Sequence, residues 1–406
     1  MLNGKTIILG VSGGIAVYKA VEVLRLLTKA GADVHVVMTA SAREFVTPLT
    51  FQTLSGNAVH TELFNLYQER EIGHISLADR ADLFVLAPAT ANLIGKVAQG
   101  LADDLLTTTL MATRAPVLVV PAMNTNMYEN PFYRQNEQLL RDAGYHLLDP
   151  VHGDLACGWA GQGKMPDPQD ILAAVEDMLA VKDFHGCSML VSAGPTREEI
   201  DPVRYLTNYS SGRMGYAIAA AACRRGARVT LVTGPCQLPS PVGVETIAVG
   251  SAQQMYDAMV GCFDTSDVVI KAAAVADYRP AQRQEQKVKK KNTTMTLELE
   301  KTLDILAELG RRKNKQILVG FAAETEKLVE HATDKLISKN LDMIAANDVS
   351  ATDAGFDVDT NIVRFLYRDG SAEQLELMSK AAVAEQLLDR VHSVWKEGSS
   401  AEIKRP

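Results

Sequence analysis

The sequence predicts an α/β protein with mainly parallel sheets, on the basis of three observations. Apolar, strand-like runs alternate with segments of helical periodicity along almost all of the 406 residues. An apolar strand, a Gly-rich turn and a helix follow one another twice, beginning at Ile7–Ala16 and again at Met189–Thr196. The length also fits two or three domains of roughly 100–200 residues each. We therefore expect two Rossmann-like, three-layer domains.

The first half is expected to hold a parallel sheet with helices between its strands. The expected strands are Thr6–Val11, Asp33–Met38, Leu83–Ala87, Val117–Pro121 and Tyr145–Leu148. Helices are expected at Ile15–Ala30 and Pro131–Ala143, and a helix at Asp170–Leu179 closes this half. The segment Val181–Cys187 is expected to be a short linker, which gives domains at 1–187 and 188–406.

The second half repeats the plan. The expected strands are Ser188–Ser192, Arg228–Thr233, Val244–Val249, Val268–Ala272, Ile317–Phe321 and Met343–Ala346. Helices are expected at Gly212–Arg225, Ser251–Phe263 and Glu324–Lys339, and a last amphipathic helix at about Leu377–Trp395. Thr296–Glu300 and Asn361–Tyr367 alternate apolar and polar residues like solvent-facing strands, and the polar segment Asp353–Asp359 is expected to be a loop.

Composition and charge exclude several classes of protein. Hydrophobic residues make up 47% and charged residues 22%, which is ordinary for a globular protein with real cores. The net charge of −8 argues against a nucleic-acid binder, because no global basic field attracts phosphate backbones. No apolar run reaches the roughly 18 residues of a membrane helix, and the N-terminus lacks the pattern of a signal peptide.

The five cysteines indicate a reducing compartment. They are odd in number, scattered, and include no C-x-x-C pair: Cys157, Cys187, Cys223, Cys236 and Cys262. A structural zinc site is therefore not expected, and reduced thiols in the cytoplasm fit best.

Four loops of the first half follow predicted strands, at the edge where open α/β sheets bind ligands. They are Ser12-Gly13-Gly14, Thr39-Ala40-Ser41, Pro88–Asn92 and Pro121–Asn124. Small and hydroxyl side chains at such positions let backbone N–H groups approach a phosphate and a flat ring. Ser-Gly-Gly alone fits a tight turn with helix capping equally well.

The loops together resemble the flavin-containing cysteine decarboxylases. The matching stretches are Ser12–Ala16, Gly73–Ile75, Ala87–Asn92, Pro121–Met127, Ala156–Gly158 and Gly163–Met165. The resemblance implies an FMN site at the strand ends, formed by Ser12, Gly13, Gly14, Thr39, Pro88, Ala89 and Thr90. It also implies that His74 acts in the oxidative half-reaction, that Asn124 holds the substrate carboxylate, and that a mobile Cys157 acts in the reductive half-reaction.

The chemistry of the implied reaction needs these residue types. A cysteine carboxylate cannot leave unless an electron sink takes up the charge, and flavin oxidation of the thiol to a thioaldehyde supplies one. An amide such as Asn124 binds the departing carboxylate without locking it in place. A thiol that has the usual pKa of about 8.5 is a suitable proton donor, and this fits the role implied for Cys157. Each residue also has a plain structural reading: His74 as a surface residue, Asn124 as a helix cap and Cys157 as buried filler.

The second half contains a long polar loop before a helix. Ser192–Glu198 and Asp201–Gly212 are rich in Ser, Thr, Gly and Arg, a composition that suits anion binding. Ala272–Tyr278 and the basic run Lys287–Lys291 follow downstream. A lysine run is more often a solvated surface, but next to an anion loop on an acidic chain it also fits a polyphosphate clamp.

These stretches resemble phosphopantothenate–cysteine ligase. The two halves together resemble the bacterial bifunctional phosphopantothenoylcysteine decarboxylase/phosphopantothenate–cysteine ligases of coenzyme A synthesis. In that family CTP activates 4'-phosphopantothenate as an acyl-cytidylate, L-cysteine attacks it, and the decarboxylase then yields 4'-phosphopantetheine. Mg²⁺ is expected to bridge the phosphates with few protein ligands, so no metal ligands are assigned.

The resemblance also implies the ligase residues. Arg204 and Asn208 are expected to serve the acyl intermediate, and Lys287 the triphosphate. The CTP site is expected at Ala273, Asp277, Lys287, Thr302, Leu303, Asp304, Ile305, Phe321, Lys335 and Lys339. Thr302–Ile305 reads Thr-Leu-Asp-Ile where the family often has Asn-Pro-Asp-Ile. A homo-oligomer is expected on resemblance alone, with a trimer-based N-terminal half and a dimerising C-terminal half.

Two other functions are alternatives to this one. A flavoprotein reductase with an NAD(P)-binding second half predicts G-x-G-x-x-G after the strand at Met189, but the sequence has Ala193-Gly194-Pro195 there. A non-catalytic FMN-binding module with the same fold leaves the joint presence of His74, Asn124 and Cys157 unexplained.

Overall fold

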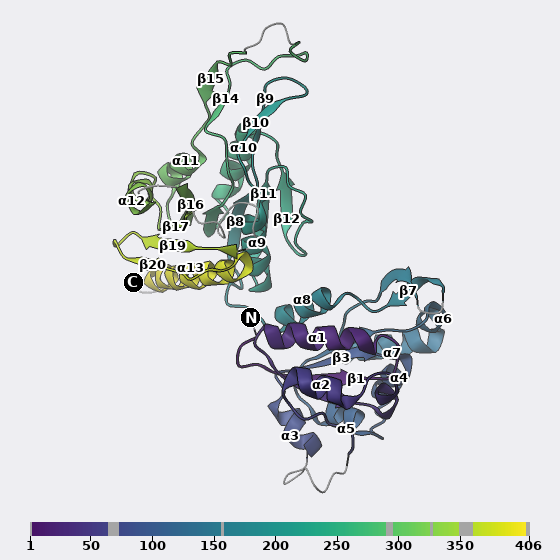
Figure 1. Ribbon diagram of the computed structural model, residues 1–406. Coiled ribbons are helices and arrows are strands. Elements are labelled where there is room, and N and C mark those ends of the chain that lie inside the picture. Colours follow the sequence, from purple (N-terminus) through teal and green to yellow (C-terminus); the bar gives the residue numbers. More distant parts are fainter. Residues whose placement is uncertain are drawn as a thin grey trace. The chain divides into compact units, whose positions relative to one another are not determined.

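The protein forms two compact units, Met1–Ala180 and Val181–Pro406 (Figure 1). The computed structural model describes residues 2–63, 73–155, 158–289, 295–324, 328–348 and 360–402. Each unit is an α/β layered structure with its own cores, which confirms the predicted fold class.

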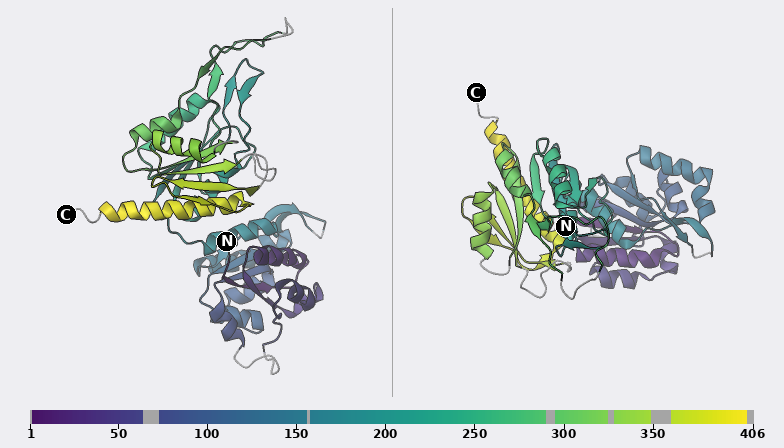
Figure 2. Two further views of the ribbon diagram at one scale, coloured as in Figure 1. Left: turned by 60° about the vertical axis from the view of Figure 1, so that its left-hand side comes forward. Right: turned by 90° about the horizontal axis from the view of Figure 1, so that it is seen from above.

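The first unit is built on a five-stranded parallel sheet with strand order β2-β1-β3-β4-β5. Its strands are β1 (Thr6–Val11), β2 (Asp33–Met38), β3 (Leu83–Ala89), β4 (Val117–Pro121) and β5 (His146–Leu147). All five lie where the sequence predicts them, and β1, β2 and β4 have the predicted bounds. These strands read as near-continuous apolar runs because helices cover both faces of the sheet (Figure 2).

Alternation along each strand feeds two cores. Ile7, Leu9 and Val11 pack on one face with helices α1 (Val17–Lys29) and α8 (Pro168–Leu179). Ile8 packs on the other face with four further helices: α3 (Gly73–Arg80), α4 (Ala91–Ala98), α5 (Leu105–Ala112) and α7 (Pro131–Asp142). Short helical segments η1 (Ala40–Glu44), α2 (Pro48–Ser55) and α6 (Thr125–Glu129) complete the unit.

A two-stranded hairpin, β6 (Val151–Asp154) and β7 (Ala160–Lys164), was not expected from the sequence. Apart from Val151 and Ala160, its residues are polar or glycine, and they show no apolar alternation. It is held at its base by Met123, whose N–H donates to the Gly163 carbonyl at 3.0 Å. Gly163 has a φ of 136°, and a Cβ there would lie 2.4 Å from the Met123 oxygen, so only glycine fits this approach.

The second unit contains an eight-stranded sheet with the order β12-β11-β8-β13-β16-β17-β19-β20. Its parallel strands are β8 (Ser188–Ala193), β11 (Arg228–Thr233), β12 (Glu245–Ala248), β13 (Val268–Lys271), β16 (Ile317–Glu324) and β17 (Met343–Asp348). The strands β19 (Val363–Tyr367) and β20 (Ala372–Gln374) extend one edge antiparallel.

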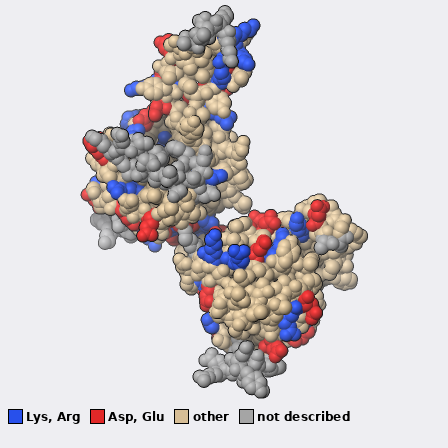
Figure 3. Space-filling view, viewed as in Figure 1, with Lys and Arg blue, Asp and Glu red and all other residues tan. Residues whose placement is uncertain are grey.

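Helices cover both faces of this sheet. One face packs on α9 (Arg213–Arg224) and α13 (Lys380–Glu402). The other packs on α10 (Ala252–Phe263), α11 (Ile305–Arg312) and α12 (Leu328–Ser338). On the surface in Figure 3, acidic and basic side chains are interspersed and form no broad basic area.

Three small antiparallel pairs lie outside the large sheet. They are β9 (Arg197–Glu199) with β10 (Tyr205–Thr207), β14 (Tyr278–Pro280) with β15 (Leu299–Lys301), and β18 (Thr360–Asn361) with β21 (Met378–Ser379). The expected strand at Thr296–Glu300 is therefore shifted to β15, and the expected strand at Asn361–Tyr367 is split into β18 and β19.

Several predicted bounds were wrong. The strand predicted to end at Phe321 continues to Glu324, because β16 pairs with β17 as far as Glu324 and Asp348. The helix predicted from Glu324 is described only from Leu328. The last helix runs beyond Trp395 to Glu402, and the loop predicted at Asp353–Asp359 lies outside the described residues.

The predicted linker Val181–Cys187 lies with the second unit. Phe184 and Cys187 are buried in its core. The Asp183 carboxylate accepts hydrogen bonds from the Arg225 Nε and Nη2 at 2.9 and 2.6 Å, and Arg225 also contacts Asp389 on α13. The segment thus closes the second unit rather than connecting two units loosely.

Candidate active sites

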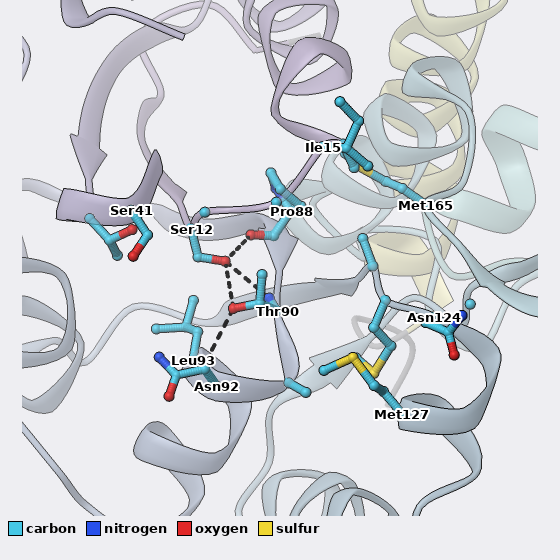
Figure 4. A pocket seen from close by; sticks show the side chains of 18 of the residues that line it. Ser12, Ile15, Ser41, Pro88, Thr90, Asn92, Leu93, Asn124, Met127 and Met165 are labelled. Carbon is cyan, nitrogen blue, oxygen red and sulfur yellow. Dashed lines mark hydrogen bonds between the residues drawn. The ribbon is translucent and has the colours of Figure 1, made fainter. Parts of the chain in front are cut away.

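The first unit contains a cavity of about 740 Å³ at the carboxyl ends of β1, β3 and β4 (Figure 4). Its volume is in the usual range for cofactor and ligand pockets. The sequence-predicted residues Ser12, Gly13, Gly14, Thr39, Pro88, Thr90 and Asn124 line it. Ala89 was also predicted to contact the cofactor, but it is fully buried in β3 and does not line the cavity.

Ser12 ties the first loop to the third. Its buried hydroxyl donates to the Pro88 carbonyl at 2.7 Å and accepts from the Thr90 N–H at 3.0 Å. The Thr90 hydroxyl in turn accepts from the Leu93 N–H at 3.3 Å and caps α4. The β1 and β3 loops therefore form one rigid wall, which Figure 4 shows around Ser12, Thr90 and Leu93.

The residues present fit a flavin phosphate and ring. The N-terminus of α1 has no side-chain cap at Ala16, so its backbone N–H groups are suited to an anion. A Cβ at Gly13 would lie 2.4 Å from the Ser41 Cβ, so the glycine lets the two loops approach closely. Apolar side chains from four segments add a non-polar wall; they are Ile15, Leu93, Met127 and Met165.

Asn124, which the resemblance implies as the carboxylate-binding residue, also has the structural role of a helix cap. It lines the cavity, and its Oδ1 accepts from the Asn126 N–H at 2.8 Å at the start of α6. The hairpin adds Asp154, Gly163 and Lys164 to the same cavity. Asn124 thus lines the same cavity as residues of the hairpin and of the strand-end loops.

Lys19 is a cavity residue that the sequence analysis missed. It lies on the inner side of α1, is 8% exposed, and donates to the Met165 carbonyl at 2.9 Å, with Asp167 at 3.3 Å. Lys19 therefore holds the segment that follows the hairpin against α1. The only sequence signal for Lys19 is that a lysine stands at a helix position where the pattern otherwise has apolar residues.

The structure does not assign the remaining predicted decarboxylase residues to this cavity. His74 begins α3 and is not among the described residues that line the cavity. Cys157 lies outside the described residues, so the structure does not locate its thiol.

In the second unit, the polar loop region surrounds the N-terminus of α9. Gly212 precedes α9 with a φ of 77°, and no side chain caps the helix there. The Thr207 hydroxyl donates to the Thr196 carbonyl at 2.7 Å, and the Asn208 amide donates to the Val275 carbonyl at 3.0 Å. The loops after β8 and β13 are thereby linked at the sheet edge where anions are expected to bind.

Asp201 connects the predicted residue Arg204 to the segment that follows Lys287. Its buried carboxylate accepts from the Arg204 Nη2 at 2.6 Å, the Val203 N–H at 2.9 Å and the Val288 N–H at 3.1 Å. The Arg204 guanidinium also donates to the Val288 carbonyl at 2.9 Å. Since Val288 follows Lys287, Arg204 and the basic run are connected through a carboxylate that sequence reasoning did not identify.

The hydrogen bonds lower the pKa of Asp201. The Arg204 hydrogen bond is the largest cause, and it outweighs the desolvation that acts in the opposite direction. The carboxylate is therefore ionised at neutral pH and accepts these hydrogen bonds in its charged form.

A second charged group lies where α11 and α12 meet the sheet. Asp304 caps α11 by accepting from the Ala307 N–H at 3.0 Å, and the Lys339 Nζ lies 2.8 Å from its other oxygen. The charges of Asp277, Asp304, Lys335 and Lys339 all act on Lys271, the last residue of β13. The structure thus brings four predicted nucleotide residues together around a lysine that was not predicted.

The other predicted nucleotide residues are arranged around this group. Ala273 is buried beside it, and its N–H donates to the Ser192 hydroxyl at 3.2 Å. The Thr302 hydroxyl donates to the Ala276 carbonyl at 2.6 Å. Leu303 is exposed and Ile305 is buried against α10. Phe321 packs on the opposite face of the sheet, with α9 and α13.

Metal-binding clusters and membrane-spanning helices are both absent from the described residues. They contain no group of three or more His, Cys, Asp or Glu side chains arranged to hold a metal ion. No described helix is both long and apolar enough to cross a membrane.

Comparison with known proteins identifies both units. The family model described as "Flavoprotein" matches residues 1–180, and the model described as "DNA/pantothenate metabolism flavoprotein C-terminal domain" matches residues 184–394. The chain is thus a flavoprotein domain followed by a pantothenate-metabolism domain.

Full-length relatives give the family. A Bacillus subtilis protein named coenzyme A biosynthesis bifunctional protein CoaBC is 49% identical over 98% of this chain and 99% of its own length. A Vibrio cholerae protein of the same name is 48% identical over 96% and 98%. The crystal structure of the C-terminal domain of a CoaBC protein has 45% identity, a TM-score of 0.47, and covers 53% of this chain and 99% of that domain.

The chain therefore belongs to the family of bifunctional coenzyme A biosynthesis proteins, CoaBC. It is a bifunctional enzyme, with a decarboxylase and a ligase that carry out two steps of coenzyme A synthesis. This confirms the family and the two activities that the sequence motifs imply.

Proposed function

We propose that the N-terminal unit binds FMN in its cavity and decarboxylates 4'-phosphopantothenoylcysteine to 4'-phosphopantetheine. The lining of the cavity by Ser12, Gly13, Gly14, Thr39, Pro88 and Thr90 is the observation that supports this most. When bound, the flavin supplies a reversible two-electron acceptor. The uncapped start of α1 suits its phosphate.

Asn124 is the proposed carboxylate-binding residue. Its Oδ1 is fixed by the Asn126 N–H, and its amide nitrogen is a donor that suits a carboxylate. A neutral donor releases carbon dioxide more readily than a guanidinium, because the charge of the carboxylate is not locked in an ion pair. Cys157 is the proposed proton donor of the reductive half-reaction.

His74 is proposed to act in a cavity of another subunit. It starts α3 away from the cavity of its own chain, and the resembled decarboxylases have FMN sites between subunits of trimer-based oligomers. Exposed apolar side chains, including Ile15, Tyr18 and Met127, surround the cavity and suit a subunit contact. We accordingly propose a homo-oligomer, with dimerising ligase units.

We propose that the C-terminal unit condenses 4'-phosphopantothenate with L-cysteine at the expense of CTP. A carboxylate is a poor electrophile, so it must first be activated, here as an acyl-cytidylate with release of pyrophosphate. The cluster of Lys271, Lys335 and Lys339 with two carboxylates supports a polyphosphate site. Lys287 is proposed at the triphosphate, and Arg204 and Asn208 at the acyl intermediate.

Mg²⁺ is proposed to reach the ligase with the nucleotide. It keeps most of its water ligands and bridges phosphates, so it needs few protein ligands. The four described cysteines form no disulfide, which fits the proposed cytoplasmic location.

Reconstitution tests both halves together. The purified protein is expected to show flavin absorbance and, with 4'-phosphopantothenate, cysteine, Mg²⁺ and CTP, to release CMP, pyrophosphate and carbon dioxide. Parallel assays with ATP measure nucleotide selectivity. A folded preparation that takes up no FMN, or product formation without CMP, contradicts the corresponding proposal.

Variants test the residue roles. Cys157→Ser is expected to alter the fate of the oxidised intermediate while ligase activity stays unchanged. When His74→Asn and Cys157→Ser proteins are mixed and allowed to exchange subunits, part of the decarboxylase activity is expected to return if His74 acts across subunits. Unchanged turnover by Cys157→Ser contradicts the proton-donor role.

A further inference from the structure

Lys271 is charged, although the alternation of residues along its strand predicts an apolar residue at this position. It ends β13, between β8 and β16, and pairs in register with Ser192 and Gly320. Val269, two residues earlier, packs in the core beneath α10, α11 and α12. Strand alternation places Lys271 on that same face, at the edge where α/β sheets bind ligands.

The local partners of Lys271 are too few for a half-buried ammonium group. Within the described part of the chain it donates one hydrogen bond, to the Ala273 carbonyl, and this bond is long at 3.3 Å. An ammonium group has three donors, and a poorly satisfied buried donor costs free energy. A methionine would fill the same position without that cost, so the ammonium group points to an acceptor that is not part of the chain.

The charges that face Lys271 favour an anionic acceptor. They come from each neighbouring element: Asp304 at the start of α11, Lys335 on α12, Lys339 after α12, and Asp277 in the loop after β13. Lys339 is already paired with Asp304 at 2.8 Å. With Lys271, the group has three ammonium charges against two carboxylates, and the excess is positive.

The position of Lys271 links it to the proposed nucleotide site. Its hydrogen bond fixes the carbonyl of Ala273, and the N–H of Ala273 is fixed by the Ser192 hydroxyl at 3.2 Å. Gly310 lets the backbone of Lys339 approach α11, since a Cβ at Gly310 would lie 2.0 Å from the Lys339 oxygen. The ammonium groups are therefore held by rigid, closely packed segments.

We propose that Lys271 is a further substrate-binding residue of the ligase, whose ammonium group donates a hydrogen bond to a phosphate oxygen of the bound nucleoside triphosphate. The inference rests on the proposed CTP site and adds to it a residue that none of the family motifs identified.

The protonation of Lys271 makes the affinity for CTP depend on pH, which a purely structural lysine would not do. Burial, followed by the charge of Lys339, lowers the pKa of Lys271 to about 8. The ammonium group is then lost as the pH rises through about 8, and with it the phosphate contact. The affinity of the wild-type protein for CTP is expected to fall between pH 7.5 and 9.5, where CTP itself keeps a constant charge.

Calorimetric binding of three probes to the full-length protein tests the proposal. Lys271→Met is expected to bind CTP and inorganic tripolyphosphate at least about ten-fold more weakly at pH 7.5, and to bind cytidine unchanged. Lys271→Arg is expected to retain CTP binding but to lose the decline above pH 8, because a guanidinium stays charged. Lys315→Met, an exposed lysine at the opposite end of β16, is the matched control and is expected to bind like the wild type.

Each result has a defined meaning. Unchanged CTP binding by Lys271→Met overturns the inference. A CTP affinity of the wild-type protein that does not change with pH also overturns it, and this measurement needs no variant. Weaker binding of cytidine alone overturns the phosphate assignment. Failure of the wild type to bind CTP refutes the proposed nucleotide, whereas wild-type binding with an unaffected variant refutes only the role of Lys271.

Discussion

At the scale of single residues, one hydroxyl group organises the flavin cavity. The Ser12 side chain satisfies both the Pro88 carbonyl and the Thr90 N–H. Ser12→Ala would leave the Thr90 N–H without this acceptor in a buried place, at a cost of about 1–3 kcal/mol. We expect weaker protection of β1 and β3 amides in hydrogen exchange and weaker FMN retention. Thr53→Ala, at an exposed hydroxyl in α2 bonded to the Leu49 carbonyl, is the control, and equal effects of both variants would contradict the prediction.

Asp183 makes the stability of the second unit depend on pH. Burial raises the pKa of Asp183, but the hydrogen bond and charge of Arg225 outweigh it and leave the pKa below its usual value. The usual value of about 3.9 applies to the unfolded chain. The carboxylate therefore stabilises the fold above about pH 4, and this contribution is lost as the pH falls further.

Asp183→Asn is accordingly expected to destabilise the second unit by about 1–3 kcal/mol at pH 7. The difference from the wild type should shrink as the pH falls below about 4, as measured by urea unfolding at several pH values. Asp389→Asn is the matched control, because Asp389 contacts the same guanidinium while its side chain is 52% exposed. A constant difference between wild type and Asp183→Asn down to pH 3 would show that the ion pair does not cause the effect.

At the scale of elements, the β6–β7 hairpin depends on one glycine. Gly163→Ala would place a Cβ 2.4 Å from the Met123 oxygen and force an unfavourable φ. The hairpin must then move away from Asn124, and we expect decarboxylation to fall at least about ten-fold, since small displacements are costly in catalysis. Ligase activity should not change. Gly95→Ala in α4, where the nearest atom is an ordinary 3.6 Å away, should keep both activities; wild-type decarboxylation by Gly163→Ala would argue against a role for the hairpin position.

Elements differed in how far the sequence determined them. The strands at Thr6–Val11, Arg228–Thr233 and Val117–Pro121 were predicted with the bounds observed, because strands buried on both faces need continuous β-branched and apolar residues. The β6–β7 and β9–β10 pairs were missed, because these strands are short and mostly polar or glycine and contain no run of apolar residues that predicts a strand.

The sites follow the same rule. The glycine and hydroxyl residues at the strand ends were predictable, because the parallel topology brings these loops to one edge. Lys19, Asp201 and Lys271 were not, because they have partners that are distant in sequence: Met165 for Lys19, Val288 for Asp201, and for Lys271 the charges at the start of α11 and at the end of α12. A lysine in an apolar pattern is the signal that Lys19 and Lys271 share.

At the scale of the whole molecule, each unit has its own sheet and cores. Division of the gene between Ala180 and Val181 is therefore expected to give two folded fragments. The first should retain FMN and decarboxylate supplied substrate, and the second should release CMP. Fragments divided between Cys187 and Ser188 are the comparison, because the second then loses Phe184 and Asp183 from its core. If the C-terminal fragments that begin at Val181 and at Ser188 were equally stable, the domain boundary at Ala180 would be contradicted.

The boundary at Ala180 also has a consequence for the cell. Because two separately folded enzymes share one polypeptide, every round of translation produces them in equal numbers. Promoter strength, messenger decay and gene dosage change both activities together and leave their ratio fixed. Only differences in turnover, inhibition or cofactor loading can make one step outpace the other.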